Sequence, residues 1–199
     1  FRIGAWRPRN ANGKETGPAP LYAGLEQSSN LMTLHLSDMV SMDAMFSVAE
    51  ASGAWPEGGL FRGPVSMLGA SETSLRSLVS GYAGIMAGGR TRASSSIRGH
   101  DAGDYVFASQ RGAEDVVRMM RGVVTRGTAA GAMRGMNVAI AGKTGTTQDG
   151  RDGIFIGMTP SVVVGVWVGR DDNRVPDPPM RGNGIPARIA RDVFEGAAA

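Results

Sequence analysis

The stretch Val138–Thr146 reads VAIAGKTGT, and there the helical pattern of the chain gives way to strands. Two apolar runs follow it, at Ile154–Ile156 and Val162–Val168, and Thr159–Ser161 supplies a tight connection between them. Runs of β-branched residues bounded by turn residues predict strands. We therefore expect three strands, the last two of which form a hairpin. Because the last run is apolar at nearly every position, we expect it to be buried on both faces and central in the sheet.

The chain before this stretch has a helical pattern, and the fold class that follows is α+β. Residues 1–19 are rich in Pro, Gly and Asn and predict an extended opening segment, whereas residues 20–135 are mainly helical. Residues 136–199 then form an antiparallel sheet with a closing helix that starts at Pro186. Within the helical part we expect two helices that meet at a polar loop, a third at 42–51, a fourth capped by Thr73, a short ribbon within 92–108 and a helix at 113–125.

Composition excludes several classes of function. The net charge is only +3, and the 19 arginines and two lysines form no run of five like charges, so a dedicated nucleic-acid surface is not expected. The chain has no cysteine and two distant histidines, His35 and His100, which argues against a metal site and against thiol catalysis. No run of 18 apolar residues is present to span a membrane. We expect no cofactor.

Gly142-Lys143-Thr144 could belong to a phosphate-binding loop, but its surroundings exclude this. Such a loop needs a glycine five residues before Gly142, where this chain has Asn137, and a helix directly after the motif. Here a turn leads into another strand instead. The motif is therefore interpreted as the edge of a strand.

Alternation along a strand would place Lys143 and Gly145 on one side, and Thr144 and Thr146 on the other. Lys143 would supply positive charge, the threonine hydroxyls would bind a carboxylate, and Gly145 would let a substrate backbone lie close. The N–H of Thr146 could polarise a carbonyl. A strand that simply ends in a polar turn remains an equal alternative.

A second polar motif, Ser28-Ser29-Asn30, lies between the first two expected helices. Its ordinary interpretation is a helix-capping loop. Its functional interpretation is a serine hydroxyl that relays protons and an asparagine amide that holds a substrate carbonyl. The pairing of this loop with a Lys-Thr-Gly strand about a hundred residues later favours the functional interpretation.

Several ordered blocks together resemble the transpeptidase domain of class A penicillin-binding proteins, over nearly the whole chain. These blocks are residues 6–10 (WRPRN), 25–30 (LEQSSN), 67–69 (MLG), 82–84 (YAG), 126–128 (RGT), 141–147 (AGKTGTT), 152–157 (DGIFIG) and 165–172 (GVWVGRDD). Blocks in the family's order are more specific than any single motif.

The resemblance implies a peptidoglycan D,D-transpeptidase that cross-links stem peptides by serine acyl transfer. Its partners would be the D-Ala-D-Ala end of a stem peptide and β-lactam antibiotics, both of which acylate the family's serine. By resemblance, Ser28 assists proton transfer to the leaving amine and Asn30 binds the substrate amide. Lys143 tunes Ser28, Thr144 and Thr146 hold the terminal carboxylate, and the Thr146 N–H forms half of an oxyanion hole.

One family motif is absent from these 199 residues. The family's attacking serine belongs to Ser-x-x-Lys, but Ala11 stands three residues before Lys14 and Ile140 stands three before Lys143. We therefore expect a C-terminal fragment of one transpeptidase domain, lacking the family's opening strands and inactive alone. The resemblance further implies a location on the periplasmic side of the bacterial inner membrane, with any membrane contact through an upstream segment.

Two alternatives stay open. The first is another serine acyl enzyme of the same fold, a β-lactamase or an esterase. A β-lactamase would need a deacylating glutamate between the two motifs, for which Glu57 and Glu72 are the candidates. The second is a non-catalytic domain that binds the cell wall.

Overall fold

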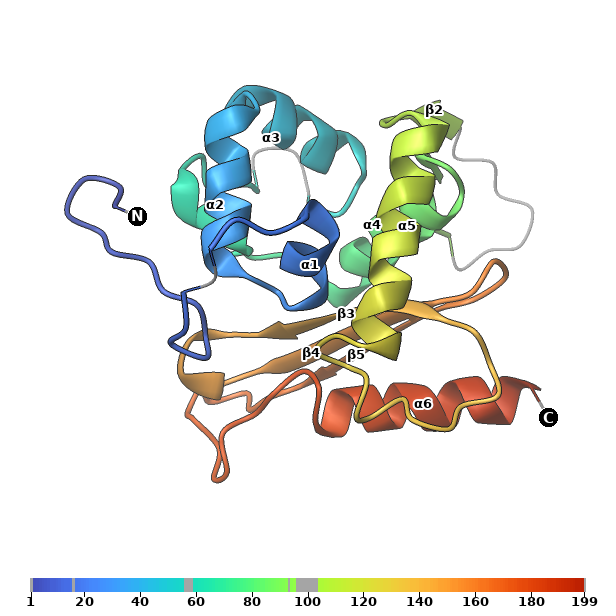
Figure 1. The fold of residues 1–199 in the computed structure, drawn as a ribbon. Helices are drawn as coiled ribbons and strands as arrows, with labels where there is room; N and C mark the ends of the chain where they lie inside the picture. The colour runs from blue at the N-terminus through green and yellow to red at the C-terminus, as the bar shows by residue number, and fades with distance from the viewer. Residues whose placement is uncertain (1, 16, 56–58, 93, 96–103, 199) are drawn as a thin grey trace.

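The computed structural model describes residues 2–15, 17–55, 59–92, 94–95 and 104–198. A group of helices lies on one face of a three-stranded antiparallel sheet, and a single long helix lies on the other face (Figure 1). The predicted α+β class is therefore confirmed. No helix in the described part of the chain is long and apolar enough to cross a membrane.

The helices of the upper layer begin where short polar side chains can cap them. The hydroxyls of Ser29, Ser41, Ser74 and Ser109 each accept a hydrogen bond from a backbone N–H in the first turn that follows. The elements are α1 (Leu21–Glu26), α2 (Asn30–Met39), α3 (Met42–Ala51), the 3₁₀ helix η1 (Pro64–Leu68), α4 (Leu75–Met86) and α5 (Gln110–Thr125).

Two of the predicted boundaries shift. Ser74 rather than Thr73 caps α4, because the Thr73 hydroxyl donates to the carbonyl of Ala54 instead. Helix α5 starts three residues before the predicted Ala113, since Ser109 provides its cap. A ribbon is present as β1 (Arg90–Arg92) and β2 (Asp104–Val106), which pair antiparallel, and its first strand begins two residues before the expected range 92–108. His100 lies outside the described residues.

The sheet consists of β3 (Ala141–Thr146), β4 (Gly153–Met158) and β5 (Val163–Val168), in that order. A short 3₁₀ helix, η2 (Gln148–Gly150), joins the first two strands. The predicted hairpin is confirmed, but the predicted central place of Val162–Val168 is wrong. Among the described strands, β4 is central, and β3 and β5 are the two edge strands; Trp167 of β5 is 43% exposed. An apolar run shows that a strand tends to be buried, but it does not show which strands are present to cover it.

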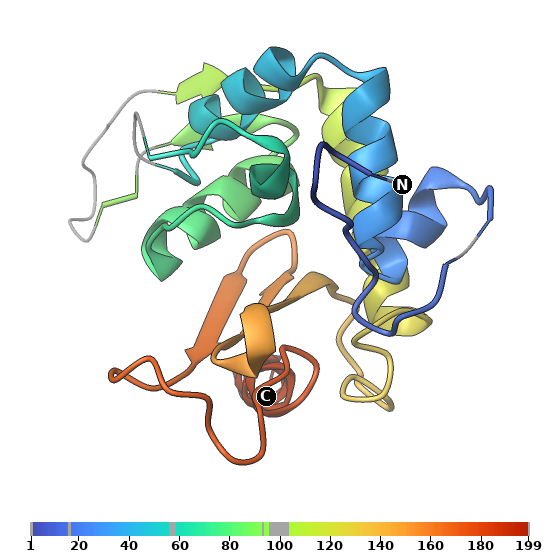
Figure 2. The same cartoon turned by 90° about the vertical axis from the view of Figure 1, so that its left-hand side faces the viewer.

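Each face of the sheet has its own apolar core. Below the sheet, helix α6 (Ile185–Ala198) places Ala187, Ala190 and Phe194 against Phe155 of β4. Above it, Met120 of α5 packs against the apolar side chains at one end of β3 and β4. Figure 2 shows the same two layers from the side, with the opening segment running beside α2. The end of α1, the end of α5 and strand β3 meet at one edge.

Candidate functional site

The loop between α1 and α2 presents Ser28 to solvent. Ser28 has a φ of 53°, in the left-handed region that residues with a side chain seldom adopt. The turn is held by hydrogen bonds from the Ser28 N–H to the Leu25 carbonyl (3.2 Å) and from the Ser29 N–H to the Gly24 carbonyl (2.8 Å). Since Ser29 is buried and caps α2, the neighbouring Ser28 is the hydroxyl left facing outward.

Strand β3 brings Lys143 to this hydroxyl. The Lys143 Nζ donates to the Ser28 Oγ at 2.7 Å, although the two residues are 115 positions apart. The same ammonium group donates to the carbonyl oxygen of Thr144 at 3.0 Å. The sequence paired these two motifs only by resemblance, and the structure places their two side chains in direct contact.

The environment of Lys143 makes its charged form less stable than it is in water. Burial against the helical layer lowers the pKa of Lys143 from 10.5 to about 8, because an ammonium ion loses hydration there. An amine with a pKa near neutrality can both hold and release a proton at physiological pH. Together with the Ser28 hydroxyl, it forms a pair able to carry a proton to or from a reacting group.

The two threonines lie on the other face of β3, as strand alternation predicted. The Thr144 and Thr128 hydroxyls are hydrogen-bonded at 2.8 Å, and the Thr146 hydroxyl accepts from the Gly182 N–H at 3.2 Å, ahead of α6. The structure therefore does not place the Thr144 hydroxyl beside Lys143. Thr146 is exposed near the end of the strand.

The backbone of β3 turns polar groups toward its outer edge. The Thr147 N–H donates to the Asp152 carbonyl. In an antiparallel pair every second residue bonds to the partner strand, so Gly145 and Lys143 also direct their backbone N–H and C=O groups toward β4. The intervening residues Thr144 and Thr146 consequently direct their N–H and C=O groups away from β4. This is the edge at which Lys143 reaches the Thr144 carbonyl. The Thr146 N–H lies along it, and Gly145 adds no side chain that would obstruct it.

Asn30 is close to the site, but its side chain is already engaged. Its Nδ2 donates to the carbonyl of Arg9 at 2.8 Å. The neighbouring Asn10 Oδ1 accepts from the Ser29 hydroxyl (3.2 Å) and from the Leu31 N–H (3.1 Å). The opening segment is thereby attached to the Ser28–Asn30 loop.

Sequence reasoning missed the ion pair directly beside this loop. Glu26, the last residue of α1, is only 4% exposed, and Arg126 at the end of α5 binds its carboxylate with two nitrogen atoms. The partners are 100 residues apart, and neither lies in a chemical motif that would reveal the pair. The available signal was the resemblance of Arg126-Gly127-Thr128 to a family block, which came without a role.

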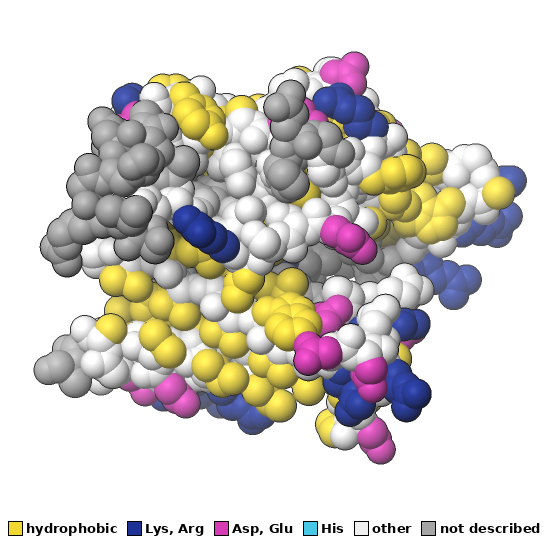
Figure 3. All heavy atoms as spheres, turned by 180° about the vertical axis from the view of Figure 1, so that it is seen from behind, with side chains coloured by type: hydrophobic (Ala, Val, Ile, Leu, Met, Phe, Trp, Pro, Cys, Tyr) yellow, Lys and Arg dark blue, Asp and Glu magenta, His cyan; other side chains and the backbone are white. Residues whose placement is uncertain are grey.

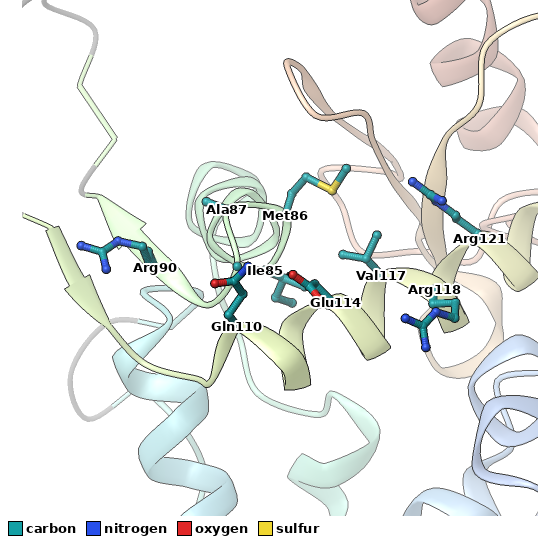
Figure 4. Close-up of a pocket in the computed structure, with 10 residues that line it drawn as sticks. Ile85, Met86, Ala87, Arg90, Gln110, Glu114, Val117, Arg118 and Arg121 are labelled. Carbon is teal, nitrogen blue, oxygen red and sulfur yellow. Dashed lines mark hydrogen bonds between the residues drawn. The ribbon is translucent and has the colours of Figure 1, made fainter.

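A hollow on the surface lies away from these residues. It has a volume of about 530 Å³ and runs between the end of α4 and α5, with Met86 and Val117 among its apolar lining (Figure 4). Glu114, Arg118 and Arg121 also line it. None of its lining residues is a predicted site residue, so the site is defined by the Ser28–Lys143 contact and the edge of β3.

The two glutamates considered for a β-lactamase and the metal-ligating side chains lie as follows. Glu57, one candidate glutamate for a β-lactamase, lies outside the described residues, and Glu72 is exposed. Among the described residues, no group of three or more His, Cys, Asp or Glu side chains could hold a metal ion.

Sequence comparison finds penicillin-binding proteins that are similar to this chain. Penicillin-binding protein 1A from Rickettsia bellii is 28% identical over 97% of this chain, which covers 28% of the relative. Penicillin-binding protein 1B from Haemophilus influenzae is 29% identical over 84% of this chain and 23% of its own length. The chain thus spans only about a quarter of the length of these relatives.

Solved structures show the same fold. Penicillin-binding protein 1A from Haemophilus influenzae superposes with a TM-score of 0.84 at 19% identity, over all of this chain and 38% of that one. PonA1 from Mycobacterium tuberculosis gives a TM-score of 0.79 at 21% identity, over 99% of this chain and 60% of that one. A family model described as the penicillin binding protein transpeptidase domain matches residues 77–195, which is more than half of the sequence. The chain therefore belongs to the penicillin-binding protein transpeptidase domain family.

Proposed function

We propose that this chain provides part of a peptidoglycan D,D-transpeptidase site. The observation that carries the proposal is the 2.7 Å contact between the Lys143 Nζ and the Ser28 Oγ, at the exposed edge of β3. A serine and a lysine of lowered pKa can move a proton, and an open strand edge can bind a peptide alongside it.

The reaction in this proposal is acyl transfer through an ester. An attacking serine oxygen bonds to the carbonyl carbon of the penultimate D-Ala, the peptide C–N bond breaks, and the terminal D-Ala leaves with a proton on its amine. An amine of a second stem peptide then attacks the ester, forms the cross-link and returns the serine. A β-lactam would acylate the same serine through its ring carbonyl.

Ser28 and Lys143 act in the proton steps of this scheme. Ser28 would pass the proton to the leaving amine, and Lys143 would hold the Ser28 hydroxyl and compensate charge that develops on it. The attacking serine and its lysine would come from a Ser-x-x-Lys motif outside these 199 residues, as the missing motif requires. The site would then lie on the periplasmic side of the inner membrane.

The substrate contacts divide between side chain and backbone. The Thr146 N–H at the outer edge of β3 suits one half of an oxyanion hole, and its exposed hydroxyl suits the terminal carboxylate. Thr144 is a weaker carboxylate ligand in this arrangement, because its hydroxyl bonds to Thr128. Asn30 would bind the substrate amide once its Nδ2 exchanges the Arg9 carbonyl for a substrate carbonyl.

The test is release of D-alanine by a longer form of the protein that carries a Ser-x-x-Lys motif. A stem peptide ending in D-Ala-D-Ala serves as donor, with a second peptide as acceptor. We expect Ser28→Ala and Lys143→Ala to lower kcat/KM by about 10²–10⁴-fold, the range for loss of a general acid or base. The control is Ser47→Ala, an exposed serine in α3. Full activity in both site variants would reject the proposal.

A further inference from the structure

We propose that the segment Arg126–Thr128, which directly follows α5, positions Ser28 against Lys143 by bonding to both halves of the site. It contacts Glu26 on the Ser28 side and Thr144 on the Lys143 side. This inference rests on the proposed function, because it gives the segment a role in that site. The contacts from which it is argued do not depend on the reaction. In this proposal, Arg126 and Thr128 are positioning residues.

The contact with the Ser28 side is made through Glu26, two residues before Ser28. The Arg126 Nε donates to one Glu26 carboxylate oxygen at 2.9 Å, and a second guanidinium nitrogen donates to the other oxygen. The Thr128 N–H donates to the Glu26 backbone carbonyl at 3.0 Å. The Arg126 guanidinium also lies 5.9 Å from the centre of the Tyr22 ring of α1. The end of α1 is therefore bound through both its side chain and its backbone.

The end of α5 is shaped to receive Glu26. A Cβ added at Gly122 would lie 2.0 Å from the Glu26 Oε1, and one at Gly127 would lie 2.3 Å from the Glu26 carbonyl oxygen. At Gly127 the crowded atoms are backbone atoms, so only glycine leaves room there, whereas a side chain at Gly122 would displace the Glu26 carboxylate. The end of α1 is thereby held against α5 by shape as well as by charge.

The contact with the Lys143 side is made through Thr128. Its hydroxyl is 2.8 Å from the Thr144 hydroxyl, and Thr144 is the residue next to Lys143 on β3. Residues 126 to 128 thus connect the turn that carries Ser28 to the strand that carries Lys143. Because this connection is three residues long, little movement of one half relative to the other is possible while both contacts hold.

The ion pair could also serve only to stabilise the packing of α1 against α5. The two interpretations differ in what happens at Lys143 when the contacts are weakened. If Arg126–Thr128 sets the position of Ser28, weakening it admits water to the Lys143 amine and restores its hydration. If the segment only adds stability, the folded molecules that remain keep Lys143 in its present environment.

The experiment measures the pKa of the Lys143 amine in the 199-residue chain. Only the neutral amine reacts with acetic anhydride, so the acetylation rate of Lys143 as a function of pH, followed by mass spectrometry, gives this pKa. Lys14 is the other lysine of the chain and serves as an exposed reference in the same sample. The measurement needs no catalytic activity, so it can fail or succeed independently of the proposed function.

We expect Glu26→Gln and Thr128→Val to raise the pKa of Lys143 from about 8 toward 10.5. Thr128→Ser keeps the hydroxyl and should leave this pKa unchanged. Glu195→Gln, which breaks the Arg191–Glu195 pair of α6, should leave it unchanged as well. A lower melting temperature in Glu26→Gln and Thr128→Val with the Lys143 pKa still near 8 would overturn the inference. Should Glu26→Gln fail to fold, Thr128→Val decides alone.

Discussion

Lys143 carries a charge in a place where water has little access. Its pKa is about 8 when the chain is folded and 10.5 when the side chain is fully hydrated. Between these two values the unfolded chain keeps the proton and the folded chain releases it. The cost of the buried charge is therefore fully present below pH 8 and decreases as the pH rises toward 10.5. A charged side chain that destabilises the fold in this way is more often kept for a functional role than for stability.

Replacement of this side chain should make the chain more stable at neutral pH. We expect Lys143→Met to raise the free energy of unfolding at pH 7 by about 1–3 kcal/mol, since it removes a partly buried charge and keeps the apolar stem. The gain should become smaller at pH 10. Urea unfolding at the two pH values measures it, with Lys14→Met as the exposed control. A variant that is less stable than the parent chain at pH 7 would contradict this account of Lys143.

The contacts of the predicted site residues were only partly foreseeable from the sequence. The alternation of Thr144 and Thr146 follows from strand geometry, whereas the pairing of Ser28 with Lys143 came from the family resemblance, and the structure places the two side chains in contact. The Glu26–Arg126 pair was not predicted, since nothing local links a glutamate to an arginine 100 residues away. The engagement of Asn30 by the Arg9 carbonyl was missed for the same reason.

The end of α5 and the residues that follow it pack closely against α1 at two glycines, Gly122 and Gly127. A Cβ at Gly127 would lie 2.8 Å from the Cα of Val123 as well as 2.3 Å from the Glu26 carbonyl oxygen, and backbone atoms cannot simply rotate away. We expect Gly127→Ala to destabilise the chain by about 1–3 kcal/mol, as overpacking usually does. Gly131→Ala is the matched control, because a Cβ there meets nothing within 4 Å. Equal melting temperatures for the two variants would show that α1 does not pack as described.

Helix α6 has one buried face and one exposed face. Phe194 is 3% exposed and packs beneath the sheet, whereas the adjacent Val193 is 46% exposed. We expect Phe194→Ala to cost about 3–5 kcal/mol and Val193→Ala less than about 1 kcal/mol. Chemical denaturation of the two variants compares them directly. A large loss from Val193→Ala would mean that this face of α6 is covered in solution.

The elements themselves were largely predictable, and the arrangement of strands was less so. Periodicity identified the helices because their apolar stripes are local, whereas the cap of α4 was placed one residue early and the cap of α5 was missed. The position of β5 in the sheet could not be predicted from its apolar pattern. Its apolar residues reflect a tendency toward burial, but the order of strands in a sheet depends on which partners are available.

The sheet and α6 share an apolar surface on one side of the molecule. Hydrophobic side chains gather there over the lower half of the molecule (Figure 3). The exposed ones on β5 and α6 and in the turn before β5 are Val162, Trp167, Ile185, Ile189 and Val193. An exposed apolar patch next to a free strand edge favours association with other apolar surfaces.

A hydrophobic dye should report this surface. We expect the chain to increase the fluorescence of anilinonaphthalene sulfonate, and a variant with Ile189→Glu and Val193→Glu to increase it less. Met39→Glu is the control, because Met39 is 82% exposed and lies on α2, away from the patch. An unchanged signal in the double variant would show that the dye binds elsewhere.

The whole molecule brings Ser28 and Lys143 together at one edge of the sheet, where we propose that they serve a penicillin-reactive serine outside these residues. Labelling by a fluorescent penicillin tests this most directly. We expect no covalent label on the 199-residue chain, rapid labelling of a longer form that carries Ser-x-x-Lys, and much slower labelling of that form with Lys143→Ala. A covalent label on the 199-residue chain itself, or undiminished labelling of the Lys143→Ala form, would contradict the account.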